Sequence, residues 1–567
     1  MSWYLYVILL YFLVLTGFNF YRSKKVKSQE DFMVAGRKLN IRIMVFTLIC
    51  TWIGSGTFIA GAEYAARAGW SSLWMPAGAW FGIVIIYFLA SKIRTFGQYT
   101  IGDILEERYG KTARVIGAIM IIIAFTTIVS YQFRAGGLIL NVVTKGKVSV
   151  EVGQTLAALF VILFTALGGM VAVAHTDLPN GIIILLACCI AVPLVVLFSG
   201  GISSAAKVLP SSHMAVFSPD FGRYPAVKAG GYFLATLTLL MGIQSMYQKF
   251  YSARTPKEAK QAVALWIVGT ILVEVIVIII AIYGATAHWI DIKEFEVINR
   301  VKVELKEGKI VPVSALARAQ EIAAEEYQNG ALKSEQYSQL IERLNATLGA
   351  ASSKEEVLSL HVGVDPASIV LKAAEDISSM SIIGLIAGLL LWGAACAVVI
   401  STGMNYLLSP TTNIMRDIYQ RFVNPKASQS TMVALQKTFV VILGVCAFLM
   451  IFIPTVKGGS ISVLRYAYVA YTMYGVTITP ALIAALAWKR ATKAGGLASI
   501  AVGGLTSLIL ELVIPNFFPS VMRDGDPWGV PGIYTSLTLS VLTLIVVSLC
   551  TKPPKRETLK KFFPELE

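Results

Sequence analysis

Residues 51–57 read Thr51-Trp-Ile-Gly-Ser-Gly-Thr57 and lie near the middle of an apolar segment that extends from residue 41 to residue 69. Each glycine in this stretch weakens a helix by about 1 kcal/mol. In the hydrocarbon of a bilayer every backbone polar group must be paired within the protein, so a break in a spanning helix is tolerated where it lines a cavity. The stretch therefore predicts a broken membrane helix beside a binding site.

A second interrupted segment lies at residues 230–250. Its residues 236–248 read Thr-Leu-Thr-Leu-Leu-Met-Gly-Ile-Gln-Ser-Met-Tyr-Gln, with a central glycine and an unusual density of hydroxyl and amide side chains. Two interrupted spans in matching positions, five helices apart, are typical of inverted-repeat transporters that bind their solute near the membrane midplane. The simpler interpretation is that each glycine only lets two helices pack closely.

The composition is that of a membrane protein. Of the 567 residues, 56% are apolar and 14% are charged, against about 25% charged residues in an average soluble domain, and the mean hydropathy is +0.69. These values exclude a disordered chain and disfavour a soluble multi-domain enzyme. We predict an all-α polytopic membrane protein, because apolar segments of about 20 residues can cross a bilayer as helices. The thirteen predicted spans are roughly 3–21, 41–69, 71–94, 115–143, 154–173, 177–200, 230–250, 262–288, 377–409, 432–456, 460–488, 494–514 and 531–550.

The net charge of +15 comes from basic loops. In a soluble protein such a charge would suggest a nucleic-acid partner, but here the basic residues gather in alternate loops between the apolar segments. The positive-inside rule places these loops in the cytoplasm, so we expect the N-terminus outside and the C-terminus inside. The basic residues of these loops are Arg22, Lys24, Lys25, Lys27, Arg37, Lys38, Arg94, Arg108, Lys111, Arg114, Arg254, Lys257, Lys260, Arg416, Arg421, Lys426, Lys489, Arg490, Lys493, Lys552, Lys555, Arg556, Lys560 and Lys561.

Residues 290–376 form a long polar segment between two predicted spans, and the topology places them outside. Residues 314–328 and 334–348 have helical composition, which predicts a small helical hairpin. Two roles are open for this segment: a peripheral cap without chemistry, or a gate or partner-docking element.

Five short motifs follow one another along the chain. They are Asp31-Phe-Met-Val-Ala-Gly-Arg37, Thr176-Asp177-Leu-Pro-Asn180-Gly181, Gln248-Lys-Phe-Tyr-Ser-Ala-Arg-Thr-Pro-Lys-Glu-Ala259, Ser401-Thr402 followed by Asp417-Ile-Tyr419, and Trp488-Lys-Arg-Ala-Thr492 with Gly495 and Gly496. Each resembles a signature of the sodium:solute symporter family, and all five occur in the family's order and on the expected side of the membrane. The resemblance covers almost the whole chain except residues 290–376.

The resemblance implies the five-plus-five inverted-repeat fold of the leucine-transporter type, with core helix 1 at 41–69, core helix 6 at 230–250 and core helix 8 at 377–409. The implied domains are an extra N-terminal span in 1–30, a first repeat in 41–200 (core helices 1–5), a second repeat in 230–488 (core helices 6–10) that carries the 290–376 insertion, two C-terminal spans in 494–550 and a cytoplasmic tail in 551–567.

The resemblance also implies a sodium site between core helices 1 and 8. The family's site uses two carbonyls beside the break in core helix 1, and one carbonyl and two hydroxyls on core helix 8. Sodium is a hard cation that prefers such oxygen ligands. The matching residues are Cys50, Ile53 and Val398 through their carbonyl oxygens, and Ser401 and Thr402 through their hydroxyls.

Asp177, at the start of core helix 5, is the family acid nearest to this site. The resemblance implies that Asp177 helps sodium leave toward the cytoplasm; the simpler interpretation is an acid at a helix N-terminus. The chain departs from the family at Met404 and Asn405, where the family has Asp and Ser, and this departure argues against a second ion site. A proton-coupled transporter of this fold would place a Lys or Arg near the cation site, and residues 50–57 and 396–405 contain none.

In this fold the solute binds between core helices 1, 3, 6, 8 and 10. Arg134 is the most informative candidate, because a guanidinium well inside a span usually faces a cavity or a partner and is a natural fork for a carboxylate. Arg134 would then hold an anionic solute. Alternatively, Arg134 pairs with Glu63 or reaches the outer interface. Glu63 in turn has an alternative partner in Arg67. The candidate solute-binding residues are Ser55, Thr57, Phe58, Gln132, Arg134, Thr236, Thr238, Gln244, Asn405 and Tyr471.

Together these features predict a sodium-coupled secondary active symporter that imports a small organic solute, such as a carboxylate, an amino acid or a related metabolite, by alternating access. The expected partners are the solute, the coupling Na⁺ and the lipid of the cell membrane, with no nucleic acid. The alternatives are a proton-coupled symporter and a solute-sensing receptor of the same fold. The short tail after residue 550 disfavours the receptor. No catalytic constellation, zinc spacing or phosphate loop stands out in the sequence, so we do not predict an enzyme.

Overall fold

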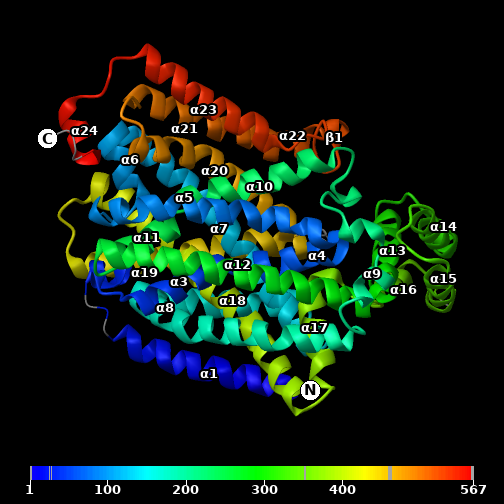
Figure 1. Cartoon of the computed structure of the whole chain (residues 1–567). Helices are drawn as coiled ribbons and strands as arrows, with labels where there is room; N and C mark the ends of the chain where they lie inside the picture. Colours follow the sequence, from blue (N-terminus) through cyan, green and yellow to red (C-terminus); the bar gives the residue numbers. More distant parts are fainter. Residues whose placement is uncertain are drawn as a thin grey trace.

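Long apolar helices form the body of the protein (Figure 1). The computed structural model describes residues 3–24, 26, 28–96, 98–349, 351, 353–456 and 463–563. In this part of the chain, eleven helices are long and apolar enough to cross a membrane, which confirms the all-α polytopic prediction. The number of thirteen spans stays a prediction. The helices of the body are α1 (Trp3–Ser23), α3 (Ile41–Trp52), α4 (Ala62–Ala68), α5 (Trp74–Phe96), α7 (Lys111–Val143), α8 (Val150–Phe198), α10 (Pro225–Gly242), α11 (Gln244–Ser252), α12 (Pro256–Ala287), α18 (Ile382–Asn413), α19 (Gln429–Val456), α20 (Val463–Ala487), α21 (Lys493–Leu508) and α23 (Gly532–Cys550).

Short elements join these helices. A two-stranded antiparallel ribbon near the end of the chain pairs Met522 with Pro527 and Arg523 with Asp526. The connecting elements are α2 (Gln29–Val34), η1 (Ala35–Arg37), η2 (Gly56–Gly61), η3 (Gly69–Leu73), α6 (Ile101–Tyr109), α9 (Ser204–Val208), η4 (Ser211–Met214), η5 (Pro219–Phe221), η8 (Ile414–Val423), η9 (Ile509–Val513), α22 (Ile514–Phe517), η10 (Pro519–Val521), β1 (Met522–Arg523), β2 (Asp526–Pro527) and α24 (Arg556–Phe562).

The helix that contains the Thr51–Thr57 stretch is broken, as the sequence predicts. Helix α3 ends at Trp52, and Ile53 has an extended backbone with φ −73° and ψ 101°. The chain resumes as the π-helical turn η2 and then as α4. The break therefore lies in the middle of the predicted span 41–69.

The second predicted break is also present. Helix α10 ends at Gly242, Ile243 is extended with φ −74° and ψ 117°, and α11 begins at Gln244. Close packing applies at the same place, because a Cβ atom on Gly242 would collide with the hydroxyl of Thr479 on α20. Gly242 therefore both ends its helix and lets α20 pack closely against it.

Helix α8 is too long for one crossing. Its 49 residues would extend about 73 Å at 1.5 Å per residue, whereas the hydrocarbon core is about 30 Å thick. Gly169, with φ 51° and ψ −158°, interrupts the helix, and a Cβ atom there would lie 2.7 Å from the ring of Phe32. The predicted spans 154–173 and 177–200 correspond to the two parts of α8, but the break at Gly169 lies inside the first predicted range rather than after residue 173.

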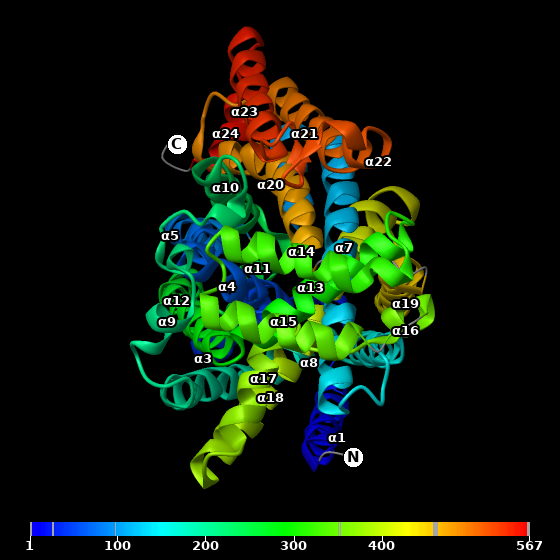
Figure 2. The ribbon, with the colours of Figure 1, turned by 90° about the vertical axis from the view of Figure 1, so that its right-hand side faces the viewer.

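The polar segment forms a helical cap at one end of the bundle, where α13, α14 and α15 lie across the ends of the long helices (Figure 2). The predicted hairpin is confirmed, because α14 and α15 cover nearly the predicted residues. The elements of the cap are α13 (Trp289–Lys306), η6 (Pro312–Ser314), α14 (Ala315–Gln328), α15 (Ser334–Leu348), α16 (Lys354–Ser359), η7 (Pro366–Ser368) and α17 (Ile369–Ser378).

The cap is tied to the bundle by ionisable side chains. His288 lies 2.9 Å from Asp291 at the start of α13 and 2.7 Å from Asp376 on α17. The hydrogen bond from His288 holds the pKa of Asp291 at about 2.

Helix α18 begins later than the predicted span 377–409, because the Ser381 hydroxyl accepts a hydrogen bond from the N–H of Gly384 and so caps a new helix at Ile382.

The two ends of the described chain lie at opposite ends of the bundle. Helix α1 starts on the side of the cap, whereas α24 lies at the far end (Figure 1). Such a placement agrees with an odd number of spans, and the orientation in the cell membrane stays a prediction. Lys25, Lys27 and residues 564–567 of the predicted cytoplasmic set lie outside the described residues.

Close packing of α5 against α10 leads to a test of the fold. A Cβ atom on Gly78 would collide with the backbone carbonyl of Phe233, which cannot move aside. We expect Gly78→Ala to lower the melting temperature of the detergent-purified protein, because overpacking of this kind costs about 1–3 kcal/mol. The control is Gly17→Ala on α1, where the added carbon meets nothing within 4 Å. Equal melting temperatures for both variants would show that α5 and α10 separate without cost.

Candidate functional site

The break after α3 releases backbone carbonyl groups. The N–H of Thr57 donates to the carbonyl of Gly54 at 3.0 Å, and the N–H of Ser55 donates to Oε1 of Gln132 at 3.2 Å. In an unbroken helix these two donors would pair with the carbonyls four residues earlier, at Ile53 and Thr51. The carbonyl of Ile53 is therefore available to other partners.

The hydroxyl of Thr402 on α18 lies next to the carbonyl group of Ile53 that the break releases. Its Oγ1 lies 3.0 Å from the carbonyl oxygen of Cys50 and 3.1 Å from that of Ile53. The approach requires Gly54, because a Cβ atom there would lie 2.7 Å from Thr402 Oγ1. Helices α3 and α18 are thus joined at the break through three oxygen atoms.

The other predicted cation ligands are close in the chain and buried. Ser401 neighbours Thr402 on α18, and its hydroxyl accepts a hydrogen bond of 2.7 Å from Nδ2 of Asn180. Val398 is one turn earlier on the same helix, and all three side chains are at most 3% exposed. The thiol of Cys50 donates a hydrogen bond to the carbonyl oxygen of Asp177. The backbone carbonyl of Cys50 is a separate group and faces Thr402. A set of carbonyl and hydroxyl oxygens fits a hard monovalent cation.

Asp177 lies inside α8, two turns beyond Gly169, so it is not an N-terminal capping residue. Its Oδ2 accepts hydrogen bonds from Thr47 at 2.5 Å and from Asn405 at 3.1 Å. Its Oδ1 has no hydrogen-bond partner among the described residues. The Asp177 side chain is fully buried.

Lys249 on α11 is a residue that the sequence analysis missed. It is 1% exposed, and its ammonium group donates to Oδ1 of Asn405 and to the sulfur of Met170. Asn405 therefore bridges the positive charge of Lys249 and the negative charge of Asp177. The stretches 50–57 and 396–405 contain no basic residue, but the fold brings one to them from the second broken helix.

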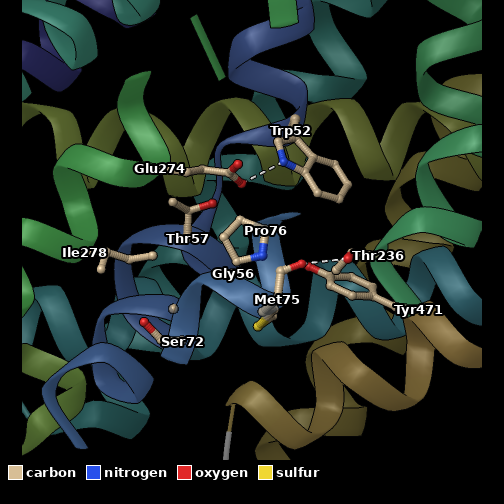
Figure 3. Close-up of a pocket in the computed structure, with 11 residues that line it drawn as sticks. Trp52, Gly56, Thr57, Ser72, Met75, Pro76, Thr236, Glu274, Ile278 and Tyr471 are labelled. Carbon is tan, nitrogen blue, oxygen red and sulfur yellow. Dashed lines mark hydrogen bonds between the residues drawn. The ribbon is translucent and has the colours of Figure 1, made fainter. Parts of the chain in front are cut away.

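A cavity lies next to the first break (Figure 3). Its free volume is about 40 Å³, far below the roughly 300–1,000 Å³ of typical small-molecule sites, so the cavity is nearly closed in this conformation. Of the predicted solute-binding residues, Thr57, Thr236 and Tyr471 line this cavity. The remaining lining residues are Trp52, Gly56, Gly61, Ser72, Met75, Pro76, Glu274 and Ile278.

The other predicted solute-binding residues do not line this cavity, and several are held elsewhere. Gln132 binds the backbone of Ser55, Gln244 accepts a hydrogen bond from the N–H of Ile101, and Thr238 donates to the carbonyl of Leu234 on its own helix. The predicted residues outside the cavity lining are Ser55, Phe58, Gln132, Arg134, Thr238, Gln244 and Asn405.

Arg134 lies toward the cap. The acids whose charges act on it are Glu151 and Asp365. Burial raises the pKa of Asp365, and the charges of Arg67 and Arg134 act against that rise. Glu63 pairs with Arg67 at 3.8 Å, as its alternative interpretation requires. Nη1 of Arg134 is buried without a hydrogen-bond partner among the described residues, and both the anion-binding and the outer-interface interpretations stay predictions.

Glu274 on α12 is the charged residue of the cavity lining, and the sequence analysis gave it no role. The indole N–H of Trp52 donates to its Oε1 at 2.8 Å, and the indole N–H of Trp80 donates to its Oε2 at 2.5 Å. An acid in the middle of an apolar span was the signal that pointed to this position.

Broken helices around a central cavity define a class of membrane transporters, and solved structures of this class have the same fold. A Na⁺-coupled sialic acid symporter in a substrate-bound, outward-open state aligns with a TM-score of 0.68 and 16% identity, covering 98% of this chain and 99% of that chain. This likeness confirms the predicted leucine-transporter type of inverted-repeat fold.

The chain belongs to the sodium:solute symporter family, whose model matches residues 32–307 and 373–503. The unmatched residues between these ranges contain α14, α15 and α16 of the cap. The osmoregulated proline transporter OpuE of Bacillus subtilis is 24% identical over 98% of this chain and 96% of its own length. The high-affinity choline transporter 1 of Caenorhabditis elegans is 23% identical over 96% of this chain and 83% of its own. The family and these relatives are transporters, not enzymes.

The position of Arg134 gives a test. We expect Arg134→Ala to change the uptake of each transported probe among sialic acid, L-proline and choline into proteoliposomes by the same factor, because the guanidinium does not line the cavity. A loss confined to the anionic sialic acid, by more than about tenfold, would place Arg134 in the solute site.

Proposed function

We propose that the protein is a sodium-coupled symporter that imports a small organic solute across the cell membrane by alternating access. The observation that carries this proposal is the approach of Thr402 Oγ1 to the carbonyl oxygens of Cys50 and Ile53. With the carbonyl of Val398 and the hydroxyl of Ser401, these atoms would hold Na⁺. The bound ion would supply a positive charge at the break, and Asp177 would lie on its exit path.

The same break connects the ion site to the solute cavity. Cys50 and Ile53 contribute to the ion site, whereas Trp52, Gly56 and Thr57 line the cavity. A cation that fixes the backbone at Ile53 would also fix the cavity wall a few residues away, and solute binding would in turn favour the ion. This reciprocal effect is the physical basis of coupling. We propose that the N-terminus faces the outside and the C-terminus the cytoplasm, so that the ion and the solute enter from the side of the cap.

Proton coupling is the second candidate, and Lys249 favours it. A lysine near the cation site is the arrangement expected of a proton-coupled transporter of this fold, and Lys249 reaches the site through Asn405. The oxygen ligands favour sodium, because a proton carried by an ammonium group has no need of three carbonyls and two hydroxyls.

Ion gradients separate the two candidates. We expect an inward sodium gradient at equal pH to drive uptake of L-proline or choline into proteoliposomes, because the oxygen ligands suit Na⁺. A pH gradient in potassium buffer without sodium should drive none. Uptake that follows the pH gradient alone, and that Lys249→Met abolishes, would establish proton coupling instead.

The ligand set can be tested by substitution. We expect the double variant Ser401→Ala, Thr402→Ala to raise the sodium concentration for half-maximal uptake by at least about tenfold, because two oxygen ligands are lost. The matched control is Thr411→Ala on the same helix, a buried hydroxyl that donates to the carbonyl of Leu408. Unchanged sodium stimulation in the double variant would rule out this site.

A further inference from the structure

Glu274 places a carboxyl group at the cavity beside the first break. The residue lies in the middle of α12, is 3% exposed, and presents its carboxylate beside Trp52 and Thr57 (Figure 3). An ionisable side chain inside a membrane span is costly, and it normally pairs with another charge or marks a substrate or ion pathway. Glu274 is therefore expected to have a countercharge.

The described residues supply no such countercharge. No Lys, Arg or His of the described residues forms an ion pair with Glu274, and its partners are the indoles of Trp52 and Trp80. An indole N–H donates a hydrogen bond but carries no charge. A carboxylate can accept about four hydrogen bonds, so the two indoles leave acceptor capacity on Glu274 for a ligand.

Aromatic rings stand on the same side of the cavity. The rings of Trp52 and Tyr471 are 6.4 Å apart between centroids, and both side chains line the cavity. The face of an aromatic ring attracts a cation. Gly56 allows the Tyr471 hydroxyl to approach the break, because a Cβ atom there would lie 2.9 Å from that hydroxyl. A carboxylate with aromatic faces next to it is a binding site for an organic ammonium group.

We propose that the solute carries a positively charged nitrogen, which binds the carboxylate of Glu274 while the rings of Trp52 and Tyr471 flank it. The inference rests on the proposed function for the assignment of this cavity to the solute, and it names the solute class. That class contains organic cations and amino-acid zwitterions. It excludes solutes whose only charge is negative, in agreement with the position of Arg134 outside the cavity.

Pairs of probes that differ only at the nitrogen provide the test. One pair is choline and its uncharged analogue with carbon in place of the quaternary nitrogen; the other is L-proline and the tetrahydrofuran carboxylate with oxygen in place of the ring nitrogen. Binding to the purified full-length protein is measured by calorimetric titration in sodium buffer. We expect the charged member of at least one pair to bind at least about tenfold tighter than its analogue.

Glu274→Gln should reduce this preference toward unity, because the amide keeps the shape of the side chain and removes its charge. The control is Glu511→Gln, since Glu511 is another buried acid of a membrane span and does not line the cavity. Melting temperatures report whether each variant folds. If Glu274→Gln does not fold, the comparison of probes on the unmodified protein still tests whether the site prefers a positively charged nitrogen.

Three results would overturn the inference: equal affinities within both pairs, a charge preference that survives Glu274→Gln, or no binding of either charged probe. Titration in potassium buffer separates this inference from the proposed function. A charge preference that depends on Glu274 but is the same in sodium and potassium would support the solute class and contradict sodium coupling.

Discussion

A backbone carbonyl that its helix no longer pairs is the constraint on which the centre of this protein depends. Leaving such a group buried and unpaired costs about 1–3 kcal/mol, and the hydrocarbon of a bilayer offers no water to satisfy it. At the end of α3 the carbonyls of Cys50 and Ile53 meet the hydroxyl of Thr402. Helix α18 must therefore lie directly against the break, and Gly54 must lack a side chain to let it approach. One local defect thus fixes the relative position of two long helices and creates a set of oxygen ligands.

The second break has a different role in the packing. The carbonyl of Gly242 accepts a hydrogen bond of 2.7 Å from the hydroxyl of Tyr474 on α20, and the same hydroxyl accepts one from the N–H of Gln244. A single side chain thus satisfies both backbone groups beside the extended residue Ile243. Because Tyr474 on α20 satisfies the backbone groups of this break, no side chain of α11 is needed there. Lys249 on α11 can therefore extend toward α18 instead. The two breaks therefore support different parts of the site: the first provides carbonyl oxygens, and the second delivers a positive charge.

Local features of the site were predictable from the sequence, whereas long-range ones were not. The glycines at Gly54 and Gly242 weaken their own helices, so both breaks could be inferred without any tertiary contact, and so could the helices of the cap. The resemblance to the family supplied Ser401 and Thr402. The partners of Arg134, Lys249 and Glu274 depend on which helices pack together. Trp52 and Glu274, for example, are 222 residues apart in the chain, and nothing in the periodicity of either helix specifies that pairing.

The charges of the proposed site would allow two cations to bind near each other. Asp177 and Lys249 balance each other through Asn405, so the proposed sodium ligands are neutral dipoles, and a bound Na⁺ would keep its full positive charge. A positively charged solute in the adjacent cavity would be repelled by that ion, and such repulsion is strong where water is excluded. Under the proposal, an ionised Glu274 would offset this repulsion, because the indoles of Trp52 and Trp80 are its partners among the described residues and carry no charge. In this arrangement the carboxylate does more than recognise the solute: it makes joint occupancy by ion and solute favourable, which is the condition that symport requires.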